Sequence, residues 1–261
     1  MEVRHFPFGQ PLKKVCQIDR TPKQAFVLGV YASAVHACWV NPQGKIKVKA
    51  LAVASEPYIF WTGEESEKYF PQIHPGLGKL IAPTDKNLNG PSGRALDKLF
   101  LTPLGFKRET SWLCDLLPES RVNSNQKYAI DREYTKAIIE QYKLKPATVP
   151  LFDKMELDSS SRRHEILAEL ESSGAETLIL LGDLPIYWFL RFYTEERYSK
   201  LAQFGETENT YGMQHKIKIN GKSYNVIPLC HPRQADSLGK ANAKWRHLHD
   251  QWIEKNSISG F

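Results

Sequence analysis

Four short apolar runs constrain the fold of this chain more than any other feature of its sequence. They are A-F-V-L-G-V-Y (25–31), S-W-L-C-D-L-L (111–117), T-L-I-L-L-G (177–182) and V-I-P-L-C (226–230). Continuous apolar runs of this length are typical of strands that are buried on both faces of a parallel sheet. We therefore expect these runs to be the four core strands of one sheet.

Helical spacing of apolar residues marks the segments between these runs. It predicts helices at 93–105, 130–143, 161–173 and 184–203, and a final basic helix at 236–255. Alternating strands and helices predict an α/β fold: a three-layer α/β/α sandwich with a central, mostly parallel four-stranded sheet.

Weaker signals complete the predicted organisation. Asn220-Gly221 predicts a hairpin that leads into the last core strand. Residues 45–53 and 58–61 suggest a peripheral pair of strands, and 71–93, rich in proline, glycine and asparagine, predict a long loop. We expect a single domain over residues 1–261, with 1–24 as an N-terminal extension.

Composition excludes several classes of protein. There is no apolar run of membrane-spanning length and no signal-peptide pattern. The four cysteines are scattered without a C-x-x-C pair, which argues against a zinc ribbon or an iron–sulfur cluster. We expect a cytoplasmic protein with reduced core thiols, no metal and no cofactor. The formal net charge of +6 is compatible with a polyanionic partner.

Polar residues and glycines follow the four predicted strands. Ligands of parallel sheets bind at the carboxyl ends of the strands, so the sequence predicts a site there. The residues at these ends are Gly29-Val30-Tyr31, Cys114-Asp115, Gly182-Asp183 and His231-Pro232.

The order of these motifs along residues 25–250 resembles the uracil-DNA glycosylase superfamily. The resemblance rests on G-V-Y-A-S (29–33), G-P-S-G-R-A-L-D-K-L-F-L-T-P-L-G-F-K-R-E (90–109), W-L-C-D-L-L-P (112–118) and H-P-R-Q (231–234). It implies that His231 donates a hydrogen bond to the 2-carbonyl oxygen of a base flipped out of DNA. Because negative charge develops on the base as the glycosidic bond breaks, such a donor stabilises the transition state. The alternative is a structural histidine satisfied by a backbone carbonyl.

The first motif departs from the family pattern. Val30 and Tyr31 stand where the family often supplies a water-activating carboxylate or amide. Tyr31 would line or plug the pocket and Ser33 would orient a water molecule, or both residues simply pack. Asp183 is a candidate replacement for the missing group, or a helix N-cap.

Asp115 stands where the family commonly uses asparagine to bind the base edge. An ionised carboxylate only accepts hydrogen bonds, which favours the exocyclic amine of cytosine, whereas a protonated one leaves uracil possible. The alternative role is a cap for the turn before Pro118. Leu88-Asn89 match the position of the base-stacking aromatic, so Phe60 or Trp61 would stack instead, or the pocket is wider. A widened pocket with an acceptor suggests a modified cytosine of the kind some phages use.

Residues after His231 are the candidates for DNA contacts. Pro232 would stiffen the turn that enters the DNA, and Arg233 or Gln234 would fill the gap left by the flipped base. Lys240, Lys244 and Arg246 on the last predicted helix would bind phosphates, or form an ordinary solvated helix face.

Three functions remain open at this stage. The first is a monomeric DNA glycosylase for a pyrimidine-type base, cytosine-type or uracil, in host defence or in base excision repair. The second is a catalytically weak relative that binds DNA or an altered base. The third is an α/β protein with another ligand, such as a nucleotide, that shares only the layered fold.

Overall fold

The computed structural model describes residues 3–236 and 243–258, and the chain divides into two compact units. The first unit consists of Met1–Val15, Tyr31–Pro91 and Pro118–Lys154. The second unit consists of Cys16–Val30, Ser92–Leu117 and Met155–Phe261. Each unit is therefore assembled from three separate stretches of sequence. This division into units does not test whether residues 1–261 form a single domain, which stays a prediction.

The second unit is built on a five-stranded sheet in the order β5-β1-β6-β8-β7. Its strands are β1 (Ala25–Tyr31), β5 (Ser111–Leu117), β6 (Thr177–Leu181), β7 (His215–Ile219) and β8 (Lys222–Leu229). β6 pairs in parallel with β1 and with β8, whereas β7 pairs antiparallel with β8. All four predicted core strands are present. The predicted number of strands is wrong, because the hairpin turn at Asn220 and Gly221, both with positive φ, adds β7 to the same sheet.

Two hydrogen bonds fix the direction of β5. The backbone N–H of Gln24 donates to the carbonyl oxygen of Thr110 at 2.9 Å, and that of Lys23 donates to the carbonyl oxygen of Ser173 at 2.7 Å. The segments leading into β5, β1 and β6 therefore lie side by side. Since the three strands start together, their carboxyl ends meet at the opposite edge of the sheet, together with that of β8.

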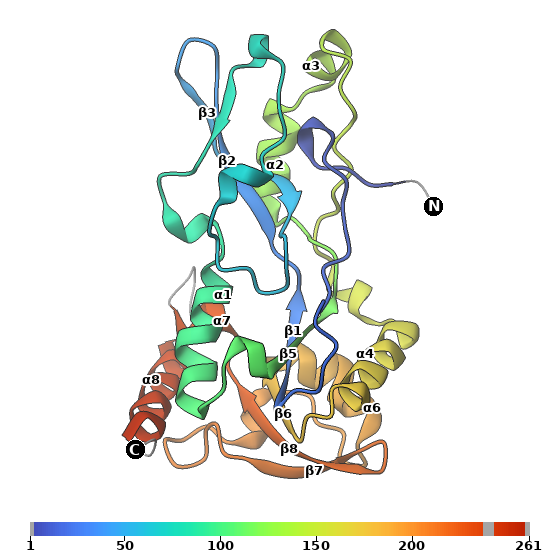
Figure 1. Ribbon diagram of the computed structural model, residues 1–261, viewed down its shortest axis with the longest axis vertical. Helices are drawn as coiled ribbons and strands as arrows, with labels where there is room; N and C mark the ends of the chain where they lie inside the picture. Colours follow the sequence, from blue (N-terminus) through green and yellow to red (C-terminus); the bar gives the residue numbers. More distant parts are fainter. Residues whose placement is uncertain (1–2, 237–242, 259–261) are drawn as a thin grey trace. The chain divides into compact units, whose positions relative to one another are not determined.

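Helices cover both faces of this sheet, with α1 and α8 on one side and α4 and α6 on the other (Figure 1). The α-helices of this part are α1 (Pro91–Ala95), α4 (Ser160–Ser172), α5 (Asp183–Pro185), α6 (Arg191–Tyr193), α7 (Pro232–Ala235) and α8 (Ala243–Ile258). Two segments are π-helical, η5 (Leu96–Leu101) and η9 (Ile186–Leu190). The 3-10 helices are η6 (Thr102–Leu104), η7 (Arg108–Thr110), η8 (Lys154–Leu157) and η10 (Leu201–Phe204). These layers give the α/β class that the sequence predicts.

Some predicted helix boundaries differ from the structure: residues 130–143 do not form one helix, because α2 (Ser124–Glu133) ends before α3 (Lys136–Gln141) begins. The helix expected at 184–203 ends at Tyr193, where Thr194 adopts an extended conformation and its hydroxyl donates to the carbonyl oxygen of Leu190. A threonine that bonds the preceding turn in this way competes with the next helical hydrogen bond. The basic helix expected at 236–255 is described as α8 from Ala243 onward, and residues 237–242 lie outside the described residues.

The first unit contains a three-stranded antiparallel sheet in the order β3-β2-β4. Its elements are β2 (Ala34–Val40), β3 (Ile46–Ser55), β4 (Lys79–Ile81), α2 (Ser124–Glu133) and α3 (Lys136–Gln141), with short 3-10 turns η1 (Pro7–Gly9), η2 (Ser66–Tyr69), η3 (Pro75–Leu77) and η4 (Lys86–Leu88). The expected pairing of 45–53 with 58–61 is wrong, because β3 pairs with β2 and 58–61 form no strand.

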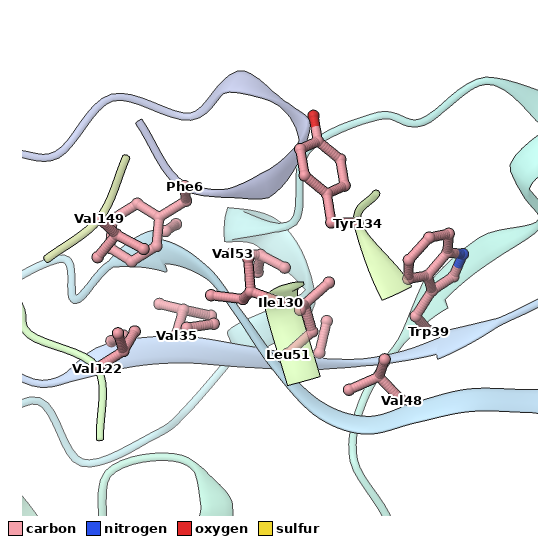
Figure 2. Close-up of a cluster of buried hydrophobic side chains, with 14 of the residues drawn as sticks. Phe6, Val35, Trp39, Val48, Leu51, Val53, Val122, Ile130, Tyr134 and Val149 are labelled. Carbon is pink, nitrogen blue, oxygen red and sulfur yellow. The ribbon is translucent and has the colours of Figure 1, made fainter. Parts of the chain in front are cut away.

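Buried side chains from distant segments form the core of the first unit (Figure 2). Trp39 of β2 is fully buried and donates its indole N–H to the carbonyl oxygen of Leu77 at 2.7 Å. Ile130 of α2 and Phe6 belong to the same cluster. The expected N-terminal extension therefore supplies a core residue, because Phe6 is completely buried.

Candidate active site at the carboxyl edge of the five-stranded sheet

The ends of β6 and β8 are in direct contact. Leu181 of β6 is level with Leu229 of β8, and the next residue, Gly182, donates its backbone N–H to the Leu229 carbonyl oxygen at 2.8 Å. Gly182 has a φ of 90°, and a Cβ atom there would lie 3.3 Å from the Cβ of His231. Glycine is therefore favoured at this position both by its backbone conformation and by the close approach of His231.

His231 is held in one orientation by the start of α7. It is the N-cap of this short helix, and its Nδ1 accepts the backbone N–H of Arg233 at 3.2 Å. The backbone N–H of His231 in turn donates to Oε1 of Gln234 at 3.0 Å. Pro232 occupies the first helical position, where its fixed φ suits the helix. This capping box fixes both the backbone and the ring.

The electrostatics of His231 define its tautomer. Burial, and secondly the charge of Arg233, lowers the pKa of its imidazole to about 4, so the ring is neutral at pH 7. Since Nδ1 accepts a hydrogen bond, the single ring proton sits on Nε2. Within the described residues no backbone carbonyl binds this ring. His231 therefore presents a fixed, neutral N–H donor at the carboxyl edge of the sheet.

Asp115 of β5 is a buried carboxylate, 3% exposed. Burial raises its pKa to about 7, and the nearby Arg162 of α4 opposes that rise. Arg162 does not bind the carboxylate, because Nη2 donates to the backbone oxygen of Asp115 at 2.7 Å and Nη1 pairs with Glu169 at 3.1 Å. No turn amide before Pro118 caps the carboxylate among the residues described. Near neutral pH this carboxyl group is therefore present in both protonation states.

Asp183 is exposed and is the first residue of α5, so the predicted N-cap role is wrong, since Gly182 takes that position. Its Oδ1 accepts the backbone N–H of Leu201 at 2.7 Å, which ties η10 to the end of β6. The water-activating role considered for Asp183 stays a prediction.

The residues of the first motif fall on both sides of the boundary between the units. Gly29 and Val30 lie in β1 within the second unit, and Val30 is 6% exposed. Tyr31 belongs to the first unit, where its ring stacks on Phe152 with ring centroids 4.7 Å apart. The backbone oxygen of Ser33 accepts the hydroxyl of Ser120. Their expected roles at a base stay predictions.

The other three predicted pocket residues, Phe60, Leu88 and Asn89, belong to the first unit. Phe60 is buried with a φ of 52°, a left-handed conformation that is uncommon for a residue with a side chain. Asn89 is buried, and its carboxamide accepts the backbone N–H of His36 at 2.8 Å and donates to the His36 oxygen at 2.9 Å. Its amide thus binds the backbone of β2. A role for these three residues in holding a base stays a prediction.

The side chains predicted to contact DNA differ in their exposure and in the partners that they already have. Arg233 is exposed, whereas the side chain of Gln234 caps His231. On α8, Lys244 pairs with Glu206 at 2.7 Å and Arg246 with Asp250 at 3.8 Å. Lys240 lies outside the described residues. Of these side chains, Arg233 is the exposed cation nearest in sequence to His231.

Sequence analysis missed Arg162, Tyr211 and His249. Arg162 lies in the first turn of α4, and no local pattern indicates that it reaches β5. His249 lies on the same face of α8 as Trp245 and Trp252, which are buried. The spacing of four and three residues places His249 on the buried face of the helix, and this spacing is the feature of the sequence that could have indicated it.

Comparison with protein-family models finds no match, and comparison with curated proteins finds none either. Within residues 3–236 and 243–258, no cluster of three or more histidine, cysteine or acidic side chains is arranged to hold a metal ion. No described helix is both long and apolar enough to cross a membrane. All four cysteines are free, and Cys38, Cys114 and Cys230 are buried.

Proposed function

We propose that the carboxyl edge of the five-stranded sheet is the catalytic edge of a DNA glycosylase. The enzyme would flip a pyrimidine-type base out of DNA and hydrolyse its N-glycosidic bond. The observation that carries this proposal is the neutral His231, with Nδ1 occupied by the Arg233 amide and the proton on Nε2.

The donor suits the charge change of this reaction. As the glycosidic bond breaks, the base leaves with the bonding electron pair, and water supplies hydroxide to the sugar carbon and a proton to the base. Negative charge on the departing pyrimidine spreads onto its 2-oxygen. With a pKa of about 4, His231 stabilises that oxygen by a hydrogen bond at pH 7 without being a charged acid.

Asp115 would set the choice of base. Its ionised carboxylate accepts from the exocyclic amine of a cytosine-type base, and its protonated form also donates to the 4-oxygen of uracil. A pKa raised to about 7 keeps both forms accessible near neutral pH. We favour a cytosine or modified cytosine as substrate, which suits defence against phage DNA. Uracil excision in repair is the alternative.

A second candidate is a relative that binds DNA or an altered base without efficient excision. It is favoured by Tyr31, which packs on Phe152 where the family often places a water-activating side chain. In both cases the partner is DNA, contacted first by the exposed Arg233, and the protein acts as a cytoplasmic monomer.

The test is alkaline strand cleavage of labelled oligonucleotides that each carry one uracil, cytosine, 5-hydroxymethylcytosine or glucosylated 5-hydroxymethylcytosine. Wild type should cleave at one of these bases, and His231→Ala should lose about 100- to 1,000-fold in rate, as expected for removing a transition-state donor. The matched control is His247→Ala, which removes an exposed histidine of α8.

Two outcomes would count against the proposal. Equal loss in His231→Ala and His247→Ala would remove His231 from the mechanism. Absence of cleavage at all four bases, with salt-dependent DNA binding retained, would favour the binding protein.

A further inference from the structure

A series of hydrogen bonds among buried residues begins at Cys230, the residue before the candidate catalytic histidine. Cys230 is the residue between the end of β8 and His231, and its backbone N–H donates to the hydroxyl of Tyr211 at 2.9 Å. The Tyr211 hydroxyl lies 2.8 Å from Nδ1 of His249, and Nε2 of His249 lies 3.0 Å from the carbonyl oxygen of Leu99. Four segments far apart in the sequence therefore meet in one chain of contacts within the second unit.

The direction of each hydrogen bond in this chain is determined. The carbonyl oxygen of Leu99 only accepts, so Nε2 of His249 carries the ring proton. Nδ1 is then an acceptor and receives the hydrogen bond that the Tyr211 hydroxyl donates, so the phenol oxygen accepts from the backbone N–H of Cys230. His249 is completely buried and its pKa is lowered to about 4 by burial, in agreement with a neutral ring.

The Leu99 carbonyl lacks its regular α-helical partner because of the local sequence. In a regular α-helix it would accept the N–H of the residue four positions later, which is Pro103 and has no N–H. The helix is also widened into the π-helical η5 over Leu96–Leu101. His249 satisfies this carbonyl and so ties α8 to the segment before β5.

Close packing leaves the chain little freedom to move. The ring of His249 stacks with Phe100 and Trp252, at centroid distances of 4.4 Å and 5.1 Å. Trp252 donates to the oxygen of Gly212 at 3.2 Å, and a Cβ at Gly212 would lie only 2.5 Å from the indole. These contacts hold His249, to which the Tyr211 hydroxyl is bonded, and Gly212, the residue after Tyr211.

We propose that Tyr211 and His249 are positioning residues for His231. They hold the Cys230 amide at the point where the chain leaves β8, and thereby set where the His231 ring meets the base. This inference rests on the proposed glycosylase function for its kinetic consequence, while the structural coupling to His231 is independent of that function.

Tyr211→Phe removes the hydroxyl and keeps the ring. It should lower the single-turnover excision rate about 10- to 100-fold, since a displacement of about 1 Å at a reacting group has effects of that size. DNA affinity should stay within about twofold, because no base or phosphate contact is removed. The matched control is Tyr224→Phe in β8, since the Tyr224 hydroxyl is buried and has no hydrogen-bond partner within the described residues.

His249 provides a test of rescue. Glutamine at this position can accept from Tyr211 and donate to Leu99, whereas leucine can do neither. His249→Gln should therefore retain more of the excision rate than His249→Leu. Equal rates for the two variants would exclude the hydrogen-bonding role of His249.

A readout independent of activity separates this inference from the proposed function. The ¹⁵N shifts of the His231 imidazole, assigned by their loss in His231→Ala, report its tautomer. Wild type and Tyr224→Phe should show the Nε2–H form, and Tyr211→Phe should shift toward a mixture of both tautomers. If wild type cleaves no base but this shift occurs, the coupling stands and the glycosylase proposal fails. If Tyr211→Phe matches Tyr224→Phe in both shifts and rate, the coupling itself is refuted.

Discussion

The burial of Asp115 has a measurable consequence for stability. Its pKa is raised from 3.8 to about 7 in the folded protein, chiefly by burial and against the opposing charge of Arg162. Between these two values the unfolded chain has released the proton and the folded protein still holds it. The free energy of unfolding therefore falls as the pH rises through this window, and it is level again above a pH of about 7.

The size of the effect follows from the shift. A difference of about three pKa units corresponds to about 4 kcal/mol, using 1.36 kcal/mol for each unit. Asp115→Asn keeps the shape of the side chain and removes its titration. Relative to wild type, this variant should gain stability steadily from a pH of about 4 to about 7, by up to about 4 kcal/mol in total. The new amide hydrogens also change the free energy of unfolding of the variant, by an amount that is the same at every pH.

The measurement is urea unfolding of both proteins at half-unit steps from pH 4.5 to 8.5, with the slope m compared at each pH. Only the pH-dependent part of the difference is used, so the constant offset does not interfere. Asp183→Asn serves as the control, because that side chain is exposed and directly follows β6, another strand of the same sheet. A difference between wild type and Asp115→Asn that is flat across this range would refute the assignment of a raised pKa to Asp115.

Two further predictions concern residues that shape the two units. Asn89→Ala should destabilise the protein by about 2–4 kcal/mol in urea unfolding, because the backbone N–H and C=O of His36 lose their partner in a buried site; a loss below about 0.5 kcal/mol would contradict it. Gly182→Ala should cost about 1–2 kcal/mol, since alanine is strained at a φ of 90° and meets the His231 Cβ at 3.3 Å. It should also shift the His231 imidazole resonances, and an unchanged spectrum would show that the contact relaxes without moving the ring.

Sequence alone predicts the elements whose signal is local. The runs at 25–31 and 177–182 form strands as expected, because a continuous apolar stretch is stable only where both faces are covered. The hairpin at Asn220-Gly221 is predicted for a similar reason, since both residues tolerate positive φ. β2 was missed, although it is buried along its whole length, because nothing local distinguishes A-V-H-A-C-W-V from a buried helix segment.

The sequence indicated the candidate residues at the strand ends, but not the residues that pack behind them. His231 is indicated by an H-P pair at the end of an apolar run, and Asp115 by a carboxylate inside one. Tyr211 was not, because its role depends on contacts with Cys230 and His249, which are distant in sequence. Asn89 shows a second limit of the sequence: its position in a motif suggests a pocket residue, which stays a prediction, whereas the pairing of its amide with the backbone of β2 depends on residues far away in the chain.

The interleaving of the two units along the chain has a consequence for biosynthesis. A ribosome that has released residues up to Lys154 has released all three segments of the first unit. At that moment β1 and β5 of the second unit have also emerged, but β6 and β8, which complete their sheet, have not yet emerged. β1 and β5, which are buried in the folded sheet, therefore lack their sheet partners until residues up to Leu229 have emerged. Nascent chains arrested shortly after Lys154 are the stage at which we expect chaperone binding to be strongest.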